Sequence, residues 1–384
     1  MILPGACIGI LGGGQLGRMT GLAARHMGYG IAVLEPTPRS PAAQIADTVI
    51  EAAYDDLDGV RRLARAADVV TYEFENIAIE AAREAAGIVP THPRPEILHI
   101  CQNRAREKQF LADNGFPCAP FAIVDSAAAL REALPAVGGA PAVLKTADFG
   151  YDGKGQQKIA ETPEDFEALW REFGAPRGVL EGFVDFALEL SVIVAANPAG
   201  EVRPFPVAEN IHTNHILDFS IVPARVPPDV ARAAVELASD IARSLQLVGL
   251  LAVEMFLTRD GRVLVNEMAP RPHNSGHWSL DGACTSQFEQ HVRAVCGLPL
   301  GDPSALKPTV MLNLLGDLWH RGTPDWSACL SDPHAKLHLY GKAEARPGRK
   351  MGHLNILADS ADDALARARA IKARLLRAAG LGDA

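Results

Sequence analysis

The chain has 384 residues, room for two or three domains, and its 48% hydrophobic and 22% charged residues are typical of a globular protein. Its formal net charge of −9 argues against binding to nucleic acid or an anionic membrane, because both require a basic surface. The six cysteines lack CxxC spacing, no basic leader segment is present, and no apolar run has the length of a membrane span, so we expect a cytoplasmic protein with free thiols.

The first predicted unit is a βαβ segment. An apolar run at 6–11 is followed by GGGQLG at 12–17, a helix-like stretch to Met27, and a second strand at 31–34 that ends at Glu35. A GxGxxG sequence with an acid at the end of the second strand is typical of a dinucleotide site. The same glycines and helix dipole suit any phosphate, so this pattern leaves two ligands open, an NAD-type cofactor or the phosphate of a small ribonucleotide.

Two acids follow the next predicted strand. Residues 68–76 read as a strand that runs into a loop at the carboxyl edge of the same sheet, where ligands collect. Glu73 and Glu75 in this loop either line the crevice or are solvated loop residues. A helix at 104–114, with Gly115 beyond its end, then leads out of the first domain.

The second unit is predicted to be a small α+β domain around a glycine-rich hairpin. Strands at 142–145 and 157–160 flank DFGYDGKGQ at 148–156, and a helix and a strand at 178–181 follow. The backbone N–H groups of such a loop can close over phosphates, although no Walker GxxxxGK[ST] sequence is present. A mobile surface hairpin is the alternative. Lys145 favours the phosphate site, because a charge that ends an apolar strand is costly unless it is paired.

The third unit contains a predicted hairpin with two glutamates. Strands at 250–257 and 262–268 flank Asp260-Gly261, a dipeptide that favours a two-residue type I′ turn. With these two residues as the turn, Glu254 lies directly across from Glu267. Two like charges among apolar residues destabilise a sheet unless a cation lies between them, and Mg²⁺ suits such oxygen ligands.

A different register would remove this metal site. If the pairing is shifted by one residue, the two glutamates are simply exposed side chains of an edge strand. The polar neighbours Asn266, Arg271 and His273 favour the metal site over this alternative.

The remaining third unit is predicted to be rich in strands. Strands are expected at 188–196, 207–212, 309–315, 336–340 and 353–358, and helices at 227–247, 285–296 and 361–378. The basic loop RPGRKMGH at 346–353 is unusual in an acidic protein. It is either a solvated run of charges or a receptor for a substrate phosphate or carboxylate.

Four motifs in this order resemble those of one family: GGGQLGRM at 12–19, YDGKGQ at 151–156, NEMAPRPHNSGHW at 266–278 and RPGRKMGHLN at 346–355. The chain resembles the N5-carboxyaminoimidazole ribonucleotide synthetases, ATP-dependent carboxylases of the ATP-grasp superfamily, over nearly its whole length. The resemblance implies a three-domain α/β and α+β fold. A Rossmann-like N-terminal domain would span 1–105, a connector and lid domain 106–186, and a C-terminal ATP-grasp domain with a small β-rich tail 187–384.

The resemblance also implies which residues bind ATP and Mg²⁺. Arg104 and Lys145 would lie on the phosphates, Glu189 would bind the ribose, and His212 would border the nucleotide. The lid over the phosphates would consist of Gly150, Tyr151, Asp152, Gly153, Lys154, Gly155 and Gln156. The adenine would be lined by Glu181, Gly182, Phe183 and Val184. Glu254 and Glu267 would hold Mg²⁺, with Asn266 beside them. Ala269 stands where many ATP-grasp ligases have a metal-ligating Asn, so the metal shell would depend more on phosphate and water.

The implied reaction has two transfers. Bicarbonate attacks the γ-phosphorus of ATP to give carboxyphosphate, and the exocyclic amine of aminoimidazole ribonucleotide then takes the carboxyl group. Arg271 would bind the oxyanions in pairs, His273 would move a proton, and Lys350 would add a further positive charge. The residues implied for the ribonucleotide are Gly14, Gln15 and Leu16 at the helix start, Lys342 and Arg349 on its phosphate, and Glu73 and Asn274.

Three other functions are possible on the sequence. Formate-dependent glycinamide ribonucleotide transformylase, another ATP-grasp ligase, would form formyl phosphate instead. An NAD-dependent dehydrogenase is supported by GxGxxG alone, and a non-catalytic nucleotide-binding regulator would need no basic acceptor loop. We expect a homodimer, the commonest symmetric state, and leave open whether the labile product is handed over to the mutase that uses it.

Overall fold

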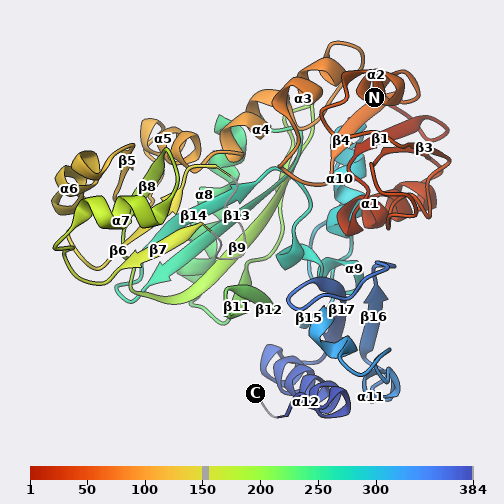
Figure 1. Ribbon diagram of the computed structural model, residues 1–384. Coiled ribbons are helices and arrows are strands. Elements are labelled where there is room, and N and C mark those ends of the chain that lie inside the picture. Colours follow the sequence, from red (N-terminus) through yellow and green to blue (C-terminus); the bar gives the residue numbers. More distant parts are fainter. Residues whose placement is uncertain (149–154, 383–384) are drawn as a thin grey trace.

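The computed structural model describes residues 1–148 and 155–382, and over these residues the chain forms three β-sheets in succession (Figure 1). The mixed α/β and α+β architecture agrees with the fold class expected from the sequence. The predicted ranges 1–105 and 106–186 each contain one sheet, and the third sheet begins at Phe186. The domain boundaries themselves stay a prediction.

The first sheet is parallel, with strand order β3-β2-β1-β4. Its strands are β1 (Cys7–Leu11), β2 (Gly30–Leu34), β3 (Thr48–Ile50) and β4 (Val69–Tyr72), accompanied by helices α1 (Gln15–His26), α2 (Leu57–Arg65), α3 (Ile79–Ala86) and α4 (Pro95–Cys101). Helix α1 starts just after the glycine turn that follows β1, as the βαβ pattern predicts. Helix α10 (Gln287–Val295), from much later in the chain, packs against α1 and adds Val292 and Val295 to the core of this sheet (Figure 1).

The second sheet is antiparallel, with order β5-β8-β6-β7. Its elements are β5 (Phe121–Val124), α6 (Ala127–Ala136), β6 (Ala142–Thr146), β7 (Gln156–Ile159), α7 (Phe166–Phe173) and β8 (Gly178–Gly182). Helix α5 (Arg104–Asp113) precedes this sheet and begins at Asn103, whose side chain accepts the N–H of Arg106 at 3.0 Å as an N-cap.

The third sheet is the largest, with order β14-β13-β9-β11-β12-β15-β17-β16 and β10 paired to β9. Its strands are β9 (Phe186–Ala196), β10 (Val202–Pro204), β11 (Ala208–Thr213), β12 (Ile216–Val222), β13 (Gly249–Thr258), β14 (Val263–Ala269), β15 (Thr309–Leu315), β16 (Ala335–Leu339) and β17 (Lys350–Leu357). The helices of this part are α8 (Pro228–Ser244), α9 (Ser279–Gly282), α10, α11 (Ser327–Leu330) and α12 (Ala361–Ala379), with 3₁₀ turns η1 (Asn274–Gly276) and η2 (Gly316–Trp319). The predicted tail helix at 361–378 is therefore confirmed.

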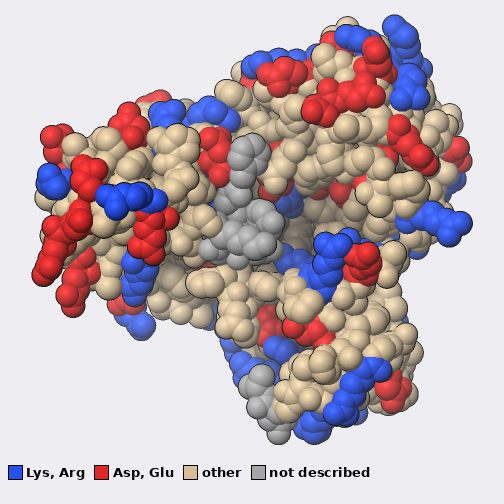
Figure 2. Space-filling model, in the orientation of Figure 1, with Lys and Arg blue, Asp and Glu red and all other residues tan. Residues whose placement is uncertain are grey.

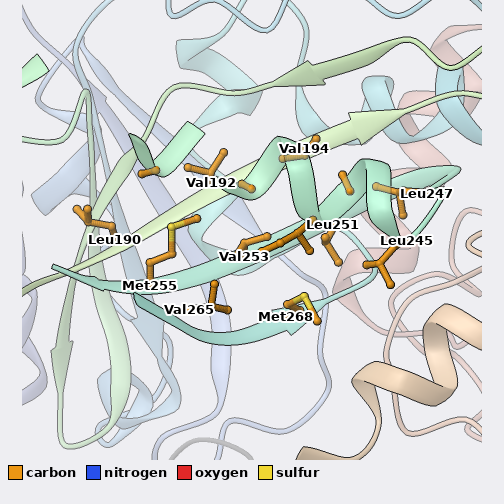
Figure 3. Packing of buried hydrophobic residues seen from close by; sticks show 14 of the residues in the cluster. Leu190, Val192, Val194, Leu245, Leu247, Leu251, Val253, Met255, Val265 and Met268 are labelled. Atoms are coloured by element: carbon orange, nitrogen blue, oxygen red, sulfur yellow. The ribbon is translucent and has the colours of Figure 1, made fainter. Parts of the chain in front are cut away.

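Alternation along the central strands decides which side chains face the interior. Val192 and Val194 on β9 and Leu251 and Val253 on β13 join one apolar cluster with α8 and the chain that follows it (Figure 3). Full burial of each such side chain contributes about 1.5–3 kcal/mol. Because successive residues of a strand point to opposite faces, Glu254 projects away from this cluster.

The glutamate hairpin has the predicted pair but a different turn. Glu254 and Glu267 are directly paired, yet nearer the turn the register changes by one residue and Asn266 forms a β-bulge. The loop holds three residues, Arg259, Asp260 and Gly261, with Gly261 at a φ of 84°. The predicted two-residue turn was therefore wrong, because Asp-Gly here completes a three-residue loop, and the bulge restores the expected pairing.

Two simpler predictions can also be compared with the structure. All six cysteines are free thiols, as expected. Within the described part of the chain, no helix is both long and apolar enough to cross a membrane.

Candidate active site

A cavity of about 920 Å³ lies among the three sheets and collects most of the predicted site residues. Figure 2 shows the molecule hollowed between these parts, with charged side chains at the rim. The predicted residues that line the cavity are Gln15, Leu16, Glu73, Arg104, Lys145, Gln156, Glu181, Gly182, Phe183, Val184, Glu189, His212, Glu254, Asn266, Glu267, Arg271, His273, Asn274 and Lys350. Segments far apart in the sequence are thus brought to one site.

Some predicted residues lie elsewhere or fall outside the described chain. Gly150, Tyr151, Asp152, Gly153 and Lys154 are outside the described residues. Gly14, Gly155, Lys342 and Arg349 are not among the lining residues of the described cavity.

All four of these residues form hydrogen bonds within the protein. Gly155 accepts the N–H of Thr146 at 2.7 Å, Lys342 Nζ donates to the carbonyl of Lys350 at 2.6 Å, and Arg349 donates to the carbonyl of Glu344 at 2.8 Å. The predicted contacts of Lys342 and Arg349 with a substrate phosphate therefore stay predictions.

The start of helix α1 already holds a carboxylate. Glu73 accepts the N–H groups of Gly14 at 2.5 Å and Gly17 at 2.9 Å, and burial raises its pKa. Glu35, the acid that a dinucleotide site would use for ribose, accepts the N–H of Gly13 at 2.8 Å instead. Two carboxylates of the chain thus occupy the groups that a dinucleotide would need, which argues against the NAD-type ligand.

One buried and one partly exposed ion pair form the wall that was predicted to bind ATP phosphates. Lys145 Nζ lies 3.1 Å from Glu181 Oε1, and Arg104 donates to Glu267 at 3.0 Å. Burial alone would raise the pKa of Glu181, but the neighbouring ammonium groups hold it below its usual value. The two glutamates therefore position Lys145 and Arg104 at the cavity wall.

The region predicted for the nucleoside combines apolar and polar groups. Phe183 is 44% exposed, a large fraction for an aromatic ring inside a cavity, and Lys158 Nζ lies 4.6 Å from its centre. Glu189 Oε2 and His212 Nδ1 are 2.9 Å apart, and the pairing of β11 with β12 changes register between Ile211 and His212, where Asp218 of β12 is the extra residue. Burial alone would lower the pKa of His212, but its bond with Glu189 raises it.

The two glutamates of the hairpin each face one nitrogen-bearing side chain. Glu254 Oε1 lies 3.0 Å from His273 Nε2, whereas Glu267 pairs with Arg104. Burial alone would raise the pKa of Glu254, but His273 lowers it to about 2. Among the described residues, no group of three or more His, Cys, Asp or Glu side chains could hold a metal. A pair of carboxylates suits Mg²⁺, which also takes water and phosphate oxygens.

The residues predicted to bind oxyanions are fixed by neighbours. Arg271 Nε donates to Glu75 Oε2, and this pair outweighs burial and lowers the pKa of Glu75 to about 2. His273 Nδ1 lies 2.9 Å from Ser275 Oγ. Asn274, predicted to bind substrate, exchanges two hydrogen bonds with Asn313, at 3.0 and 2.6 Å, so its amide also joins the loop to β15.

Two buried ionisable residues beside the cavity were missed from the sequence. Lys108 and Glu107 lie on α5, and Glu107 accepts the N–H of Met268 at 3.0 Å. Burial, followed by repulsion from Glu267, raises the pKa of Glu107 to about 8. A signal was present, because positions 104, 107 and 108 have the spacing that places side chains on one face of a helix.

Comparison with known proteins places the chain in a class. Residues 109–288 match the ATP-grasp domain, residues 6–102 the ribonucleotide synthetase preATP-grasp domain, and residues 309–367 the phosphoribosylaminoimidazole carboxylase C-terminal domain. The fold is therefore that of an ATP-grasp ligase.

Relatives narrow this class to one family. The N5-carboxyaminoimidazole ribonucleotide synthase of Bacillus subtilis is 48% identical over 94% of both chains, and that of Brucella melitensis is 47% identical over 91% of this chain and 96% of its own. A crystal structure of an N5-carboxyaminoimidazole ribonucleotide synthetase with ADP superposes with a TM-score of 0.90, at 47% identity and 97% coverage of both chains. An Aspergillus clavatus enzyme in complex with ADP and 5-aminoimidazole ribonucleotide gives 0.88, at 31% identity and coverage of 97% and 99%. The chain belongs to the N5-carboxyaminoimidazole ribonucleotide synthase family.

Proposed function

We propose that this protein carboxylates aminoimidazole ribonucleotide to N5-carboxyaminoimidazole ribonucleotide, using ATP and bicarbonate and releasing ADP and phosphate. One observation carries the proposal. A single cavity joins the phosphate-binding lysine Lys145, the carboxylate pair Glu254 and Glu267, and the oxyanion group Arg271 and His273. The names of the relatives support the same reaction.

The carboxylate pair is the proposed Mg²⁺ site. Asn266 Oδ1 is a buried oxygen beside Glu267 with no hydrogen-bond partner among the described residues, which fits a third oxygen donor there. Glu254 and Glu267 would hold the ion together with this oxygen. When bound, Mg²⁺ would neutralise negative charge on the transferring phosphoryl group.

The protein side chains around the phosphates would orient the first transfer. Lys145 and Arg104 would bind the phosphate oxygens, and the planar guanidinium of Arg271, fixed by Glu75, would hold bicarbonate for attack on the γ-phosphorus. The attack breaks the bond to ADP and forms carboxyphosphate. Lys350, at the start of β17 on the cavity wall, would add positive charge near this intermediate.

The second transfer needs a proton acceptor. When the exocyclic amine attacks the carboxyl carbon, phosphate leaves and the amine nitrogen must lose a proton. In the structure His273 Nε2 lies 3.0 Å from Glu254 Oε1, so this nitrogen donates its proton to the carboxylate. When Glu254 binds Mg²⁺ and the ring proton lies on Nδ1 towards Ser275 Oγ, Nε2 would be free to take the proton of the amine. Closure over the site would exclude water, which otherwise hydrolyses carboxyphosphate.

The ribonucleotide would lie between the first sheet and the basic loop. Gln15 and Leu16 line the cavity at the start of α1, and their N–H groups are the proposed donors to its phosphate because Glu73 holds the N–H of Gly14. A cytoplasmic location, a homodimer and hand-over of the product to a mutase remain further parts of this proposal.

An ADP-release assay tests the reaction. Purified protein with ATP and Mg²⁺ is compared without acceptor, with aminoimidazole ribonucleotide and bicarbonate, and with glycinamide ribonucleotide and formate. We expect release only in the second mixture, and its loss on chelation of Mg²⁺ or in Glu267→Ala. Lys307→Met, which removes an exposed ion pair with Asp359, is the matched control and should retain activity. Release only in the third mixture would assign the chain to transformylation instead.

A further inference from the structure

Lys108 is a buried lysine to which the proposed reaction gives no role. It lies on α5, is 2% exposed, and its Nζ is 3.3 Å from Glu181 Oε2. The same Nζ donates to the backbone carbonyl of Asn266 at 3.0 Å. A lysine is almost never buried to this extent without paired charges, so its contacts define its role.

Glu181 is shared between two lysines. Its Oε2 faces Lys108, whereas its Oε1 faces Lys145 at 3.1 Å. The three groups come from α5, β8 and β6, and the contact with Asn266 adds β14. The cluster therefore links the second sheet to the strand that carries the metal-site glutamate Glu267.

The two lysines differ in their access to ligand. Lys145 lines the cavity and its side chain is 11% exposed, whereas the side chain of Lys108 is 3% exposed and is not among the lining residues. A nucleotide phosphate can therefore reach Lys145 but not Lys108. When Lys145 turns to a phosphate, Glu181 loses one of the two cations with which it forms ion pairs, while it stays 3% exposed.

An unpaired carboxylate at that depth would be costly. Breaking a buried ion pair by removal of one partner is strongly destabilising, because the remaining charge has no compensation. Lys108 supplies that compensation, since it contacts the second oxygen of Glu181 and is anchored to the carbonyl of Asn266.

We propose that Lys108 is a positioning residue for nucleotide binding, which holds Glu181 and neutralises it so that Lys145 can exchange Glu181 for a nucleotide phosphate. This inference rests on the proposed use of ATP at the site. Without Lys108, the whole charge of Glu181 attracts Lys145 and competes with the phosphate. Lys108 therefore acts through Glu181 and never touches the ligand.

A double-mutant cycle separates this role from a purely structural one. Binding of ADP with Mg²⁺ is measured by calorimetry for wild type, Lys108→Met, Glu181→Gln and the double variant, with Lys307→Met as a remote control. We expect Lys108→Met to weaken ADP binding roughly tenfold, within the usual range of coupling between contacting residues. In the Glu181→Gln background, the same change should weaken binding less than about twofold.

The cycle stays informative if Lys108→Met does not fold. The double variant lacks the uncompensated carboxylate, so it should fold and bind ADP within about twofold of Glu181→Gln. Equal losses in both backgrounds, or no loss in either, would overturn the inference.

Failure of the proposed function is distinguishable from failure of this inference. Wild-type protein that binds no ADP would overturn both. Wild-type protein that binds ADP but releases none with aminoimidazole ribonucleotide would overturn the proposed reaction alone, and the cycle would still decide the role of Lys108.

Discussion

At the start of helix α1 and at the wall around Lys145, groups that could bind a ligand are paired with carboxylates of the protein. Without a ligand the backbone N–H groups at the start of α1 would have no hydrogen-bond acceptor, and the carboxylates of Glu35 and Glu73 accept from them. At the wall, the cation of Lys145 would be unpaired, and Glu181 compensates it. In both regions a ligand that takes these same groups must displace a partner from the protein, so its net binding energy is smaller than the new contacts alone suggest.

The two regions differ in how that exchange is supported. Glu181 keeps Lys108 when Lys145 turns away, whereas the Gly14 N–H is held by a carboxylate that would have to leave. The wall is therefore suited to ligand exchange, and the glycine turn to a fixed internal structure.

The largest expected effect is at the wall. Lys145→Met should lower kcat/KM for ATP by about 10²–10³-fold, because it removes a positive charge from the transferring phosphates. The fold should be kept, since Glu181 retains Lys108. Steady-state kinetics with varied ATP measure the loss, and a change below about threefold would contradict the assignment of Lys145.

The second effect is at the glycine turn. Gly12 has a φ of +111°, and an added Cβ would lie 2.3 Å from Cγ of Glu73. Gly12→Ala should therefore lower the free energy of unfolding by about 2–4 kcal/mol without any ligand. Urea denaturation measures this. If Gly12→Ala is as stable as wild type, the predicted clash between the added Cβ and Glu73 does not occur.

A third prediction concerns pH. His291 lies beneath the first sheet, with its Nε2 2.7 Å from Thr71 Oγ1, and burial lowers its pKa to about 3. The folded state keeps this ring neutral, whereas the unfolded chain binds a proton below pH 6.5. Stability should therefore be complete above about pH 6.5 and fall by up to about 1.4 kcal/mol per pH unit towards pH 3 for this group.

Denaturation at a series of pH values, with His291→Gln as the comparison, measures this dependence. The variant should show a shallower decline below pH 6.5. Parallel curves for variant and wild type would exclude His291 as a source of the acid sensitivity.

The smallest effect should come from the exposed edge of the nucleotide region. Lys158 lies over the ring of Phe183, a contact of about 0.5–1 kcal/mol at an exposed position. Lys158→Met should raise the KM for ATP two- to fivefold with little change in kcat. An unchanged KM would remove Lys158 from the nucleotide region, and Phe183→Leu tests the ring itself.

The sequence predicted which residues gather at the cavity better than it predicted the turns that place them. The pairing of Glu254 with Glu267 was confirmed although the loop was wrong, because the bulge at Asn266 offsets the extra loop residue. The register of such a pair is strongly constrained, because a shift by one residue would move every side chain of the strand to the other face. The choice between a two-residue and a three-residue loop depends on a small difference in free energy.

Other features had no clear local signal. Strand β12 was not predicted, and the turn before it places Asn214 and His215 at φ values of 50° and 64° without any glycine. Lys108 and Glu107 share a helix face with Arg104, but this spacing does not indicate burial, which results from the packing of α5 against two sheets. The motifs marked residues that line the cavity, while the residues that compensate their charge could be identified only from the tertiary structure.

The packing of α10 on the first sheet affects how the chain can fold during synthesis. Val292 and Val295 share a core with Ile8 and Ile10, so this core stays incomplete until nearly 300 residues have left the ribosome. The N-terminal segment, although made first, would expose an apolar surface and depend on chaperones for longer than a self-contained domain. Protease digestion of ribosome-bound chains that end before and after α10 tests this, and equal protection of residues 1–105 in both would contradict it.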